Sequence, residues 1–176
     1  MKNFKKLGVG AAALVAALGL ASVAPTEAQA QSCSGNLIKS FPINSPKNGE
    51  QIGALDVYYS KRNGGTNTAC MRHHNKTWGE GLETRVAIQR CDGYYDCDTA
   101  GPWKNDGGHY KYYAGPVFVS GTRKNCVAVR GVFEDRYSDE RVYIHAWNLG
   151  CGATPQVTYP SPRSDTRCRP HMRCPQ

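Results

Sequence analysis

Eight cysteines are the feature that most restricts the folds open to this 176-residue chain. They stand at positions 33, 70, 91, 97, 126, 151, 168 and 174, and none lies in the first 32 residues. An even number of cysteines in an exported chain of this size indicates disulfide bonds. The spacings include no C-x2-C pair, so they do not match a structural zinc site, and we predict neither a metal nor a cofactor.

The N-terminus has the organisation of a secretory signal peptide. Three lysines in the first six residues precede an apolar run over 7–20, and Ala28-Gln29-Ala30 supplies a small-x-small cleavage site. The run is shorter than the about 20 residues that span a membrane. We therefore expect cleavage after Ala30, no integral membrane segment in the mature protein, and a location outside the cell.

The sequence predicts that the cysteines form disulfides more firmly than it predicts which cysteines pair, because eight cysteines allow about 105 pairings. Two pairs would close short local loops, one would join two apolar strands, and the last would tie the ends of the domain together. This reasoning predicts the pairs Cys91–Cys97, Cys168–Cys174, Cys70–Cys126 and Cys33–Cys151.

Alternation of apolar and polar residues predicts about seven short strands and no helix. The strands are expected over 37–43, 52–60, 68–74, 84–91, 109–119, 126–132 and 140–149. Clusters of Gly, Asn and Pro separate them, as in antiparallel β-sandwiches. The fold class predicted is all-β, a disulfide-stabilised antiparallel sandwich over residues 31–151.

The stretch 109–132 is expected to be a hairpin, with its turn over 120–125. Gly115-Pro116 interrupts the first arm. Since proline cannot donate a hydrogen bond to a neighbouring strand, this position predicts a bulge or a sheet edge.

Within this stretch the sequence resembles a known family. G-G-H-Y-K-Y-Y-A-G-P-V at 107–117, N-C-V at 125–127, G-A-L-D-V-Y-Y-S at 53–60 and T-N-T-A-C at 66–70 carry the likeness. They resemble the spore-associated protein A family, small secreted proteins of filamentous actinobacteria. The resemblance spans about residues 33–151. It implies export and association with the cell or spore surface, and it supplies no catalytic residues.

Residues 152–176 form a distinct tail that contains five prolines and four arginines. The prolines predict an irregular arm, pinned by the Cys168–Cys174 bond. After cleavage the chain carries 19 basic and 13 acidic residues, a net charge of +6, and half of this excess lies in the tail. The arm could lie on an anionic surface or could serve solubility alone. We expect a cell-wall or spore-surface polymer as partner rather than nucleic acid.

Aromatic residues give the main indication of a binding role. Ten tyrosines and three tryptophans are present, and exposed rings are used by sugar-binding and protein-binding surfaces. The candidate ligand-binding residues are Tyr94, Trp103, Tyr113 and Trp147. The sequence thus favours a secreted, non-enzymatic structural or binding protein of the cell or spore surface, with carbohydrate as a candidate ligand.

The alternative from another class is a small secreted hydrolase, such as a ribonuclease. It would use His74, Glu83 and His145 as general acid and base, although no spacing forces these residues together. No nucleophile elbow, phosphate loop or dinucleotide motif is present. Four aspartates over 92–106 could offer carboxylates to calcium, but they match no calcium-loop pattern.

Overall fold

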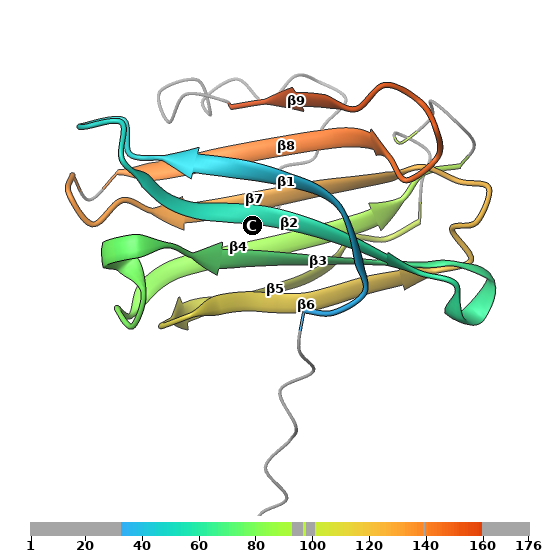
Figure 1. Ribbon diagram of the computed structural model, residues 1–176, viewed down its shortest axis with the longest axis horizontal. Coiled ribbons are helices and arrows are strands. Elements are labelled where there is room, and N and C mark those ends of the chain that lie inside the picture. The colour runs from blue at the N-terminus through green and yellow to red at the C-terminus, as the bar shows by residue number, and fades with distance from the viewer. Residues whose placement is uncertain (1–32, 93–96, 98–100, 139, 160–176) are drawn as a thin grey trace, which may run out of the picture. The chain divides into compact units, whose positions relative to one another are not determined.

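The computed structural model describes residues 33–92, 97, 101–138 and 140–159, and within them the chain is an antiparallel β-sandwich (Figure 1). The strands are β1 (Asn36–Asn44), β2 (Gln51–Ser60), β3 (Thr66–His73), β4 (Leu82–Arg90), β5 (Lys104–Tyr110), β6 (Tyr113–Ser120), β7 (Val127–Glu134), β8 (Arg141–Leu149) and β9 (Gln156–Thr158). Two short 3-10 helices, η1 (Arg62–Gly64) and η2 (Asn75–Thr77), follow β2 and β3. The predicted fold class is confirmed.

The strands form two sheets. One has the order β1-β2-β3-β6 and the other the order β5-β4-β7-β8-β9, with antiparallel pairing throughout. Figure 1 shows them as two layers. In the central strands, alternate residues point into the space between the sheets, as the period-two pattern requires. The core contains residues such as Leu55, Met71, Ile88, Phe133 and Ile144, all with 2 % or less of their surface exposed.

The predicted hairpin over 109–132 is wrong. Its first arm is divided between β5 and β6, and β6 and β7 belong to different sheets. The connection at 121–126 therefore crosses from one sheet to the other instead of folding β7 back onto β6. Alternation gives each strand one apolar face, but it does not say which other strand pairs with it.

The prediction for Gly115-Pro116 is confirmed in both of its forms. β6 is an edge strand, and its register with β3 shifts between Ala69 and Met71, which pair with Val117 and Ala114. Gly115 and Pro116 are the two residues of β6 that have no partner in this register, so the missing N–H of the proline removes no hydrogen bond between the strands.

Three disulfides lie within the described residues, and they correct two of the predicted pairs. Cys91–Cys97 is confirmed. The bonds Cys33–Cys70 and Cys126–Cys151 replace the predicted Cys33–Cys151 and Cys70–Cys126. The physical reason is the topology. Cys70 lies in the four-stranded sheet, whereas Cys126 directly precedes β7 of the other sheet, where Val127 pairs with Leu149 at the end of β8. The predicted Cys168–Cys174 bond lies outside the described residues.

The sandwich extends beyond the predicted boundary at residue 151. We expected no regular pairing after Gly152, but β9 pairs with β8 through His145, Ala146 and Trp147. Pro155 precedes this short edge strand, so it removes no donor from the three pairs. In the described part of the chain there is no helix of the length and apolarity needed to cross a membrane. The disulfides indicate an oxidising compartment.

Candidate functional site

The residues of the hydrolase alternative do not meet. Glu83 on β4 and His145 on β8 both point to the outer face of the five-stranded sheet, but β7 lies between them. His145 is in register with Arg130 and Ala87, four residues along β4 from Glu83. Standard strand dimensions put their backbones about 16 Å apart. His74 lies at the end of β3 in the other sheet, so the three cannot act on one substrate atom.

Glu83 is held by two arginines. Arg85 Nη2 lies 2.7 Å from one carboxylate oxygen, and Arg141 Nε donates to the other at 2.8 Å. Burial opposes ionisation, but the hydrogen bond and charge of Arg141, together with Arg85, outweigh it and lower the pKa of Glu83. An ionised carboxylate engaged in this way ties β4 to β8 across β7 and is a poor proton donor.

His145 belongs to an aromatic cluster on the same outer face. Its ring lies 5.1 Å from that of Trp147 and 6.2 Å from that of Trp103, and the guanidinium of Arg130 stacks 4.1 Å above Trp103. Burial, and then the positive charge of Arg130, lower the pKa of His145 to about 4. Near neutral pH the ring is therefore uncharged and packs against the two tryptophans.

Two predicted ligand residues, Trp103 and Trp147, are therefore part of this cluster. Both are partly buried and pack against Cys91, Cys126 and Ala128 beside the two disulfides at this end of the sheet. One face of Trp103 is covered by Arg130. The cluster acts as a small second core on the outer face of the five-stranded sheet.

Of the other two predicted ligand residues, the structure describes Tyr113 alone. Tyr113 is half-buried on β6, opposite Arg72 in the four-stranded sheet. Tyr94 lies outside the described residues, as do Asp96, Asp98 and the tail arginines. Asp106 accepts hydrogen bonds from Tyr110 and from the backbone of Gly115. Among the described residues, no group of three or more His, Cys, Asp or Glu side chains is placed to hold a metal.

Trp78, the most exposed tryptophan of the described residues, contacts a second exposed ring. Trp78 and Tyr112 retain 57 % and 47 % of their surface in solvent, and their ring centroids lie 4.9 Å apart at an interplanar angle of 52°. Tryptophan is usually largely buried, so an exposed pair of this kind marks a contact surface. We call Trp78 and Tyr112 the aromatic platform.

The platform is built from two loops. Trp78 directly follows η2, and Tyr112 lies in the turn between β5 and β6. The N–H of Gly79 donates to the Lys111 carbonyl at 2.8 Å, which fixes one loop against the other. Thr77 is buried, and its hydroxyl lies 2.6 Å from the Ile52 carbonyl, so η2 is tied to β2.

His73 joins both loops from the core side. Its backbone N–H donates to the Tyr112 carbonyl at 2.8 Å, and its ring Nδ1 lies 3.0 Å from the Thr77 carbonyl. Because a carbonyl only accepts, Nδ1 carries the proton. In the neutral ring, the Thr84 hydroxyl then donates to Nε2 at 2.8 Å. Burial lowers the pKa of His73, against the opposing effects of Thr77 and Glu80, which favours this neutral form.

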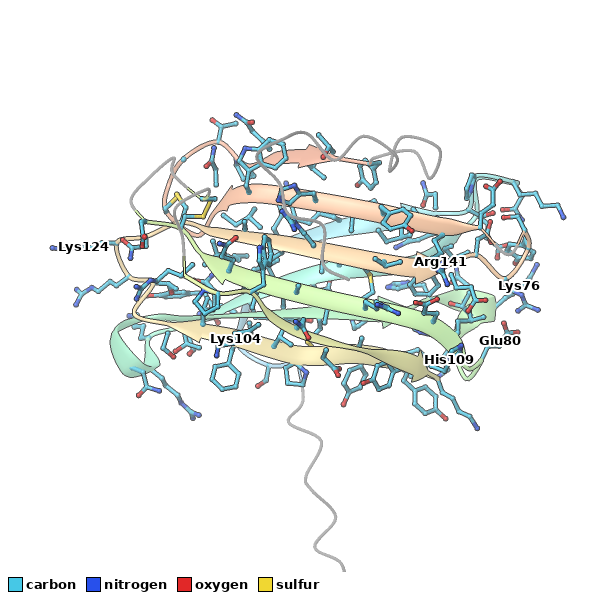
Figure 2. The ribbon with its side chains drawn as sticks, turned by 180° about the vertical axis from the view of Figure 1, so that it is seen from behind. Lys76, Glu80, Lys104, His109, Lys124 and Arg141 are labelled. Carbon is cyan, nitrogen blue, oxygen red and sulfur yellow. A yellow bond between two sulfur atoms is a disulfide. The ribbon has the colours of Figure 1, made fainter. Side chains whose placement is uncertain are left out.

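The charged groups around the platform are mostly paired with one another. Arg136 forms an ion pair with Glu80 and donates to the Lys76 carbonyl, while Lys76 lies 3.7 Å from Glu50. Figure 2 shows Lys76, Glu80, His109 and Arg141 gathered at this end of the sandwich. The platform thus presents flat rings beside hydrogen-bonding groups with little net charge.

Sequence reasoning did not select Trp78 as a ligand residue. One signal was present: the residue stands in H-H-N-K-T-W-G-E-G, a polar and glycine-containing stretch between predicted strands. A tryptophan with no apolar neighbours in sequence is a candidate for exposure. Tyr112 carried no such signal, because it looks like the first of two tyrosines in a strand.

Comparison with known proteins identifies no relative: no family model, no curated protein and no solved structure matches the chain. The resemblance to the spore-associated protein A family therefore stays a prediction.

Proposed function

We propose that this chain is an exported, non-enzymatic binding protein that attaches to a carbohydrate polymer of the cell or spore surface through the aromatic platform. The observation that carries the proposal is the exposed Trp78–Tyr112 pair, held in place by buried hydrogen bonds. Location at the cell or spore surface, and membership of the spore-associated protein A-like group of actinobacterial proteins, belong to the same proposal.

The chemistry of the platform favours an uncharged sugar. Pyranose rings have an apolar face that stacks on aromatic side chains, with hydroxyls at the rim for polar contacts. The platform supplies two rings, and Glu80, Arg136 and Lys76 lie within one hydrogen-bonded group beside them. Since these charges pair with each other or with Glu50, a strongly anionic ligand gains little here.

Preorganisation also supports binding. Ordering an exposed loop when a ligand arrives reduces affinity, so a loop already fixed by core contacts binds more tightly for the same contact area. Both platform loops are fixed in this way by His73 and Thr77.

The test is a pull-down of the folded mature protein on chitin, cellulose and isolated cell wall, followed by titration with a soluble fragment of whichever binds. We expect Trp78→Ala and Tyr112→Ala each to weaken binding by tenfold or more. The matched control is Phe118→Ala, which removes a ring that is 49 % exposed on the outer face of the four-stranded sheet. Wild-type protein that stays wholly in the supernatant with all three polymers would refute the proposal, and so would equal losses for Phe118→Ala.

A further inference from the structure

The end of the sandwich opposite the aromatic platform is strongly basic. Four exposed cations, Lys61, Arg62, Arg123 and Lys124, lie in the two loops 61–65 and 121–125. These ten residues include no acidic, aromatic or aliphatic side chain other than the lysine and arginine stems. Figure 2 shows Lys124 at the opposite end of the molecule from Lys76 and Glu80. We call the two loops the basic end.

Backbone hydrogen bonds join the two loops into one unit. Gly121 donates to Asn63 at 3.2 Å, Thr122 to Gly65 at 3.1 Å and Arg123 to Gly64 at 3.0 Å. Gly65 has a φ of 93°, and a Cβ there would lie 2.7 Å from the backbone nitrogen of Arg123. The approach of the two backbones therefore requires glycine, and it holds cations from separate parts of the chain next to each other.

A fifth cation extends the surface. The guanidinium of Arg90, at the end of β4, lies 3.2 Å from the position that a Cβ of Gly121 would occupy. The five ion pairs formed within the described residues all involve cations other than these five. Among the described acidic residues, Asp92 is the nearest in sequence to these five cations, two residues after Arg90. Like charges held together without neutralisation repel one another, which costs stability unless a ligand is gained.

The charge is therefore unevenly distributed along the sandwich. At the platform end acidic and basic side chains pair, whereas at the basic end cations accumulate. Such a distribution steers an anion toward one end of the molecule.

We propose that the basic end binds a linear phosphate-bearing polymer. Arginine matches phosphate oxygens with two parallel donors, and lysine adds point charge, so Arg62, Arg123 and Lys124 form a phosphate-binding set. Insertion into a membrane needs apolar side chains beside the cations. Binding of single-stranded nucleic acid relies on exposed rings on which bases stack. The two loops supply neither, whereas a flexible polymer that presents only its charged groups needs only these side chains.

The test uses inorganic polyphosphate as the probe, with labelled chains titrated against the full mature protein by fluorescence anisotropy. The first variant is the double substitution Arg123→Glu and Lys124→Glu, and the second, on the partner loop, is Lys61→Glu with Arg62→Glu. The matched control is Lys39→Glu with Lys111→Glu, which changes the net charge equally at exposed sites elsewhere. Thermal unfolding of each variant verifies that it is folded.

We expect each loop variant to bind polyphosphate at least tenfold more weakly than wild type, and the control less than threefold more weakly. For wild type, four contacts predict that log K falls with log salt with a slope of about −3 between about 50 and 200 mM, and each loop variant should reduce the slope by about 1.4. Equal losses in loop and control variants would assign the binding to net charge or to the arginine-containing tail, and would overturn the proposal. Tighter binding to phosphatidylglycerol vesicles or to single-stranded DNA than to polyphosphate would also overturn it.

Discussion

His145 makes the stability of the sandwich depend on pH. In the folded chain, burial and the charge of Arg130 lower the pKa of this imidazole from 6.5 to about 4. The unfolded chain therefore binds more protons between these two values, so the free energy of unfolding falls as the pH falls through the window. The contribution is complete above pH 6.5 and is lost by about pH 4.

The magnitude follows from the same shift. Each pKa unit corresponds to about 1.4 kcal/mol, so protonation of His145 should remove about 3 kcal/mol of stability across the window. This is a large fraction of the 5–15 kcal/mol that is typical of whole domains. The physical source is a cation placed against Arg130 and between two indole rings, where water reaches it poorly.

Urea unfolding at a series of pH values, followed by tryptophan fluorescence, measures this effect. The comparison is with His145→Gln, which keeps a polar side chain of similar size but cannot take up a proton. His73 titrates in the same direction in both proteins, so its contribution cancels in the difference. We expect wild type to lose its advantage over the variant as the pH falls. A difference that stays constant from about pH 7 to about pH 4 would refute the reasoning.

Three further predictions concern stability. Replacing Cys33 and Cys70 by alanine opens a 37-residue loop and should cost about 4 kcal/mol in urea unfolding, whereas a non-reducing peptide map that joins Cys33 to another cysteine would contradict the connectivity. Gly53→Ala should cost about 1–3 kcal/mol, because its Cβ would lie 2.7 Å from the Phe133 ring, and an unchanged unfolding midpoint would disprove this close packing. Asp56→Asn removes the buried charge that binds Arg72 on β3 and should lower the free energy of unfolding by about 2 kcal/mol. An unchanged free energy of unfolding would contradict this prediction.

The fold class could be predicted because its causes are local. Alternation of apolar and polar residues fixes strand positions, and Gly, Asn and Pro fix the turns between them. The Gly115-Pro116 edge was predictable for the same reason: proline lacks an N–H wherever it stands. Three-dimensional topology has no such local cause. The loop over 121–126 can reverse a strand within one sheet or carry it to the other, and the choice depends on which partners bury more apolar surface.

The disulfides also show which predictions require knowledge of the topology. Cys91 and Cys97 are close in sequence, so their pairing needed no knowledge of topology. The partners of Cys70 and Cys126 depend on which sheet each strand joins, and the apolar character of the two strands does not reveal this, so pairing them with each other was incorrect. The surroundings of the aromatic residues also depend on the topology. Arg130 stacks on Trp103, and both Trp103 and Trp147 pack against the disulfide region, whereas Trp78 and Tyr112 lie in loops and stay exposed.

Strand β3 connects the two surfaces proposed as binding sites. It begins at Thr66, next to the basic end, and ends at His73, whose hydrogen bonds hold the aromatic platform. Eight residues of extended chain span about 26 Å. That separation is too large for both surfaces to contact one small ligand. It suits a protein that binds an uncharged polymer at one end and an anionic polymer at the other, and the rigid strand between them means that neither ligand needs to displace the other.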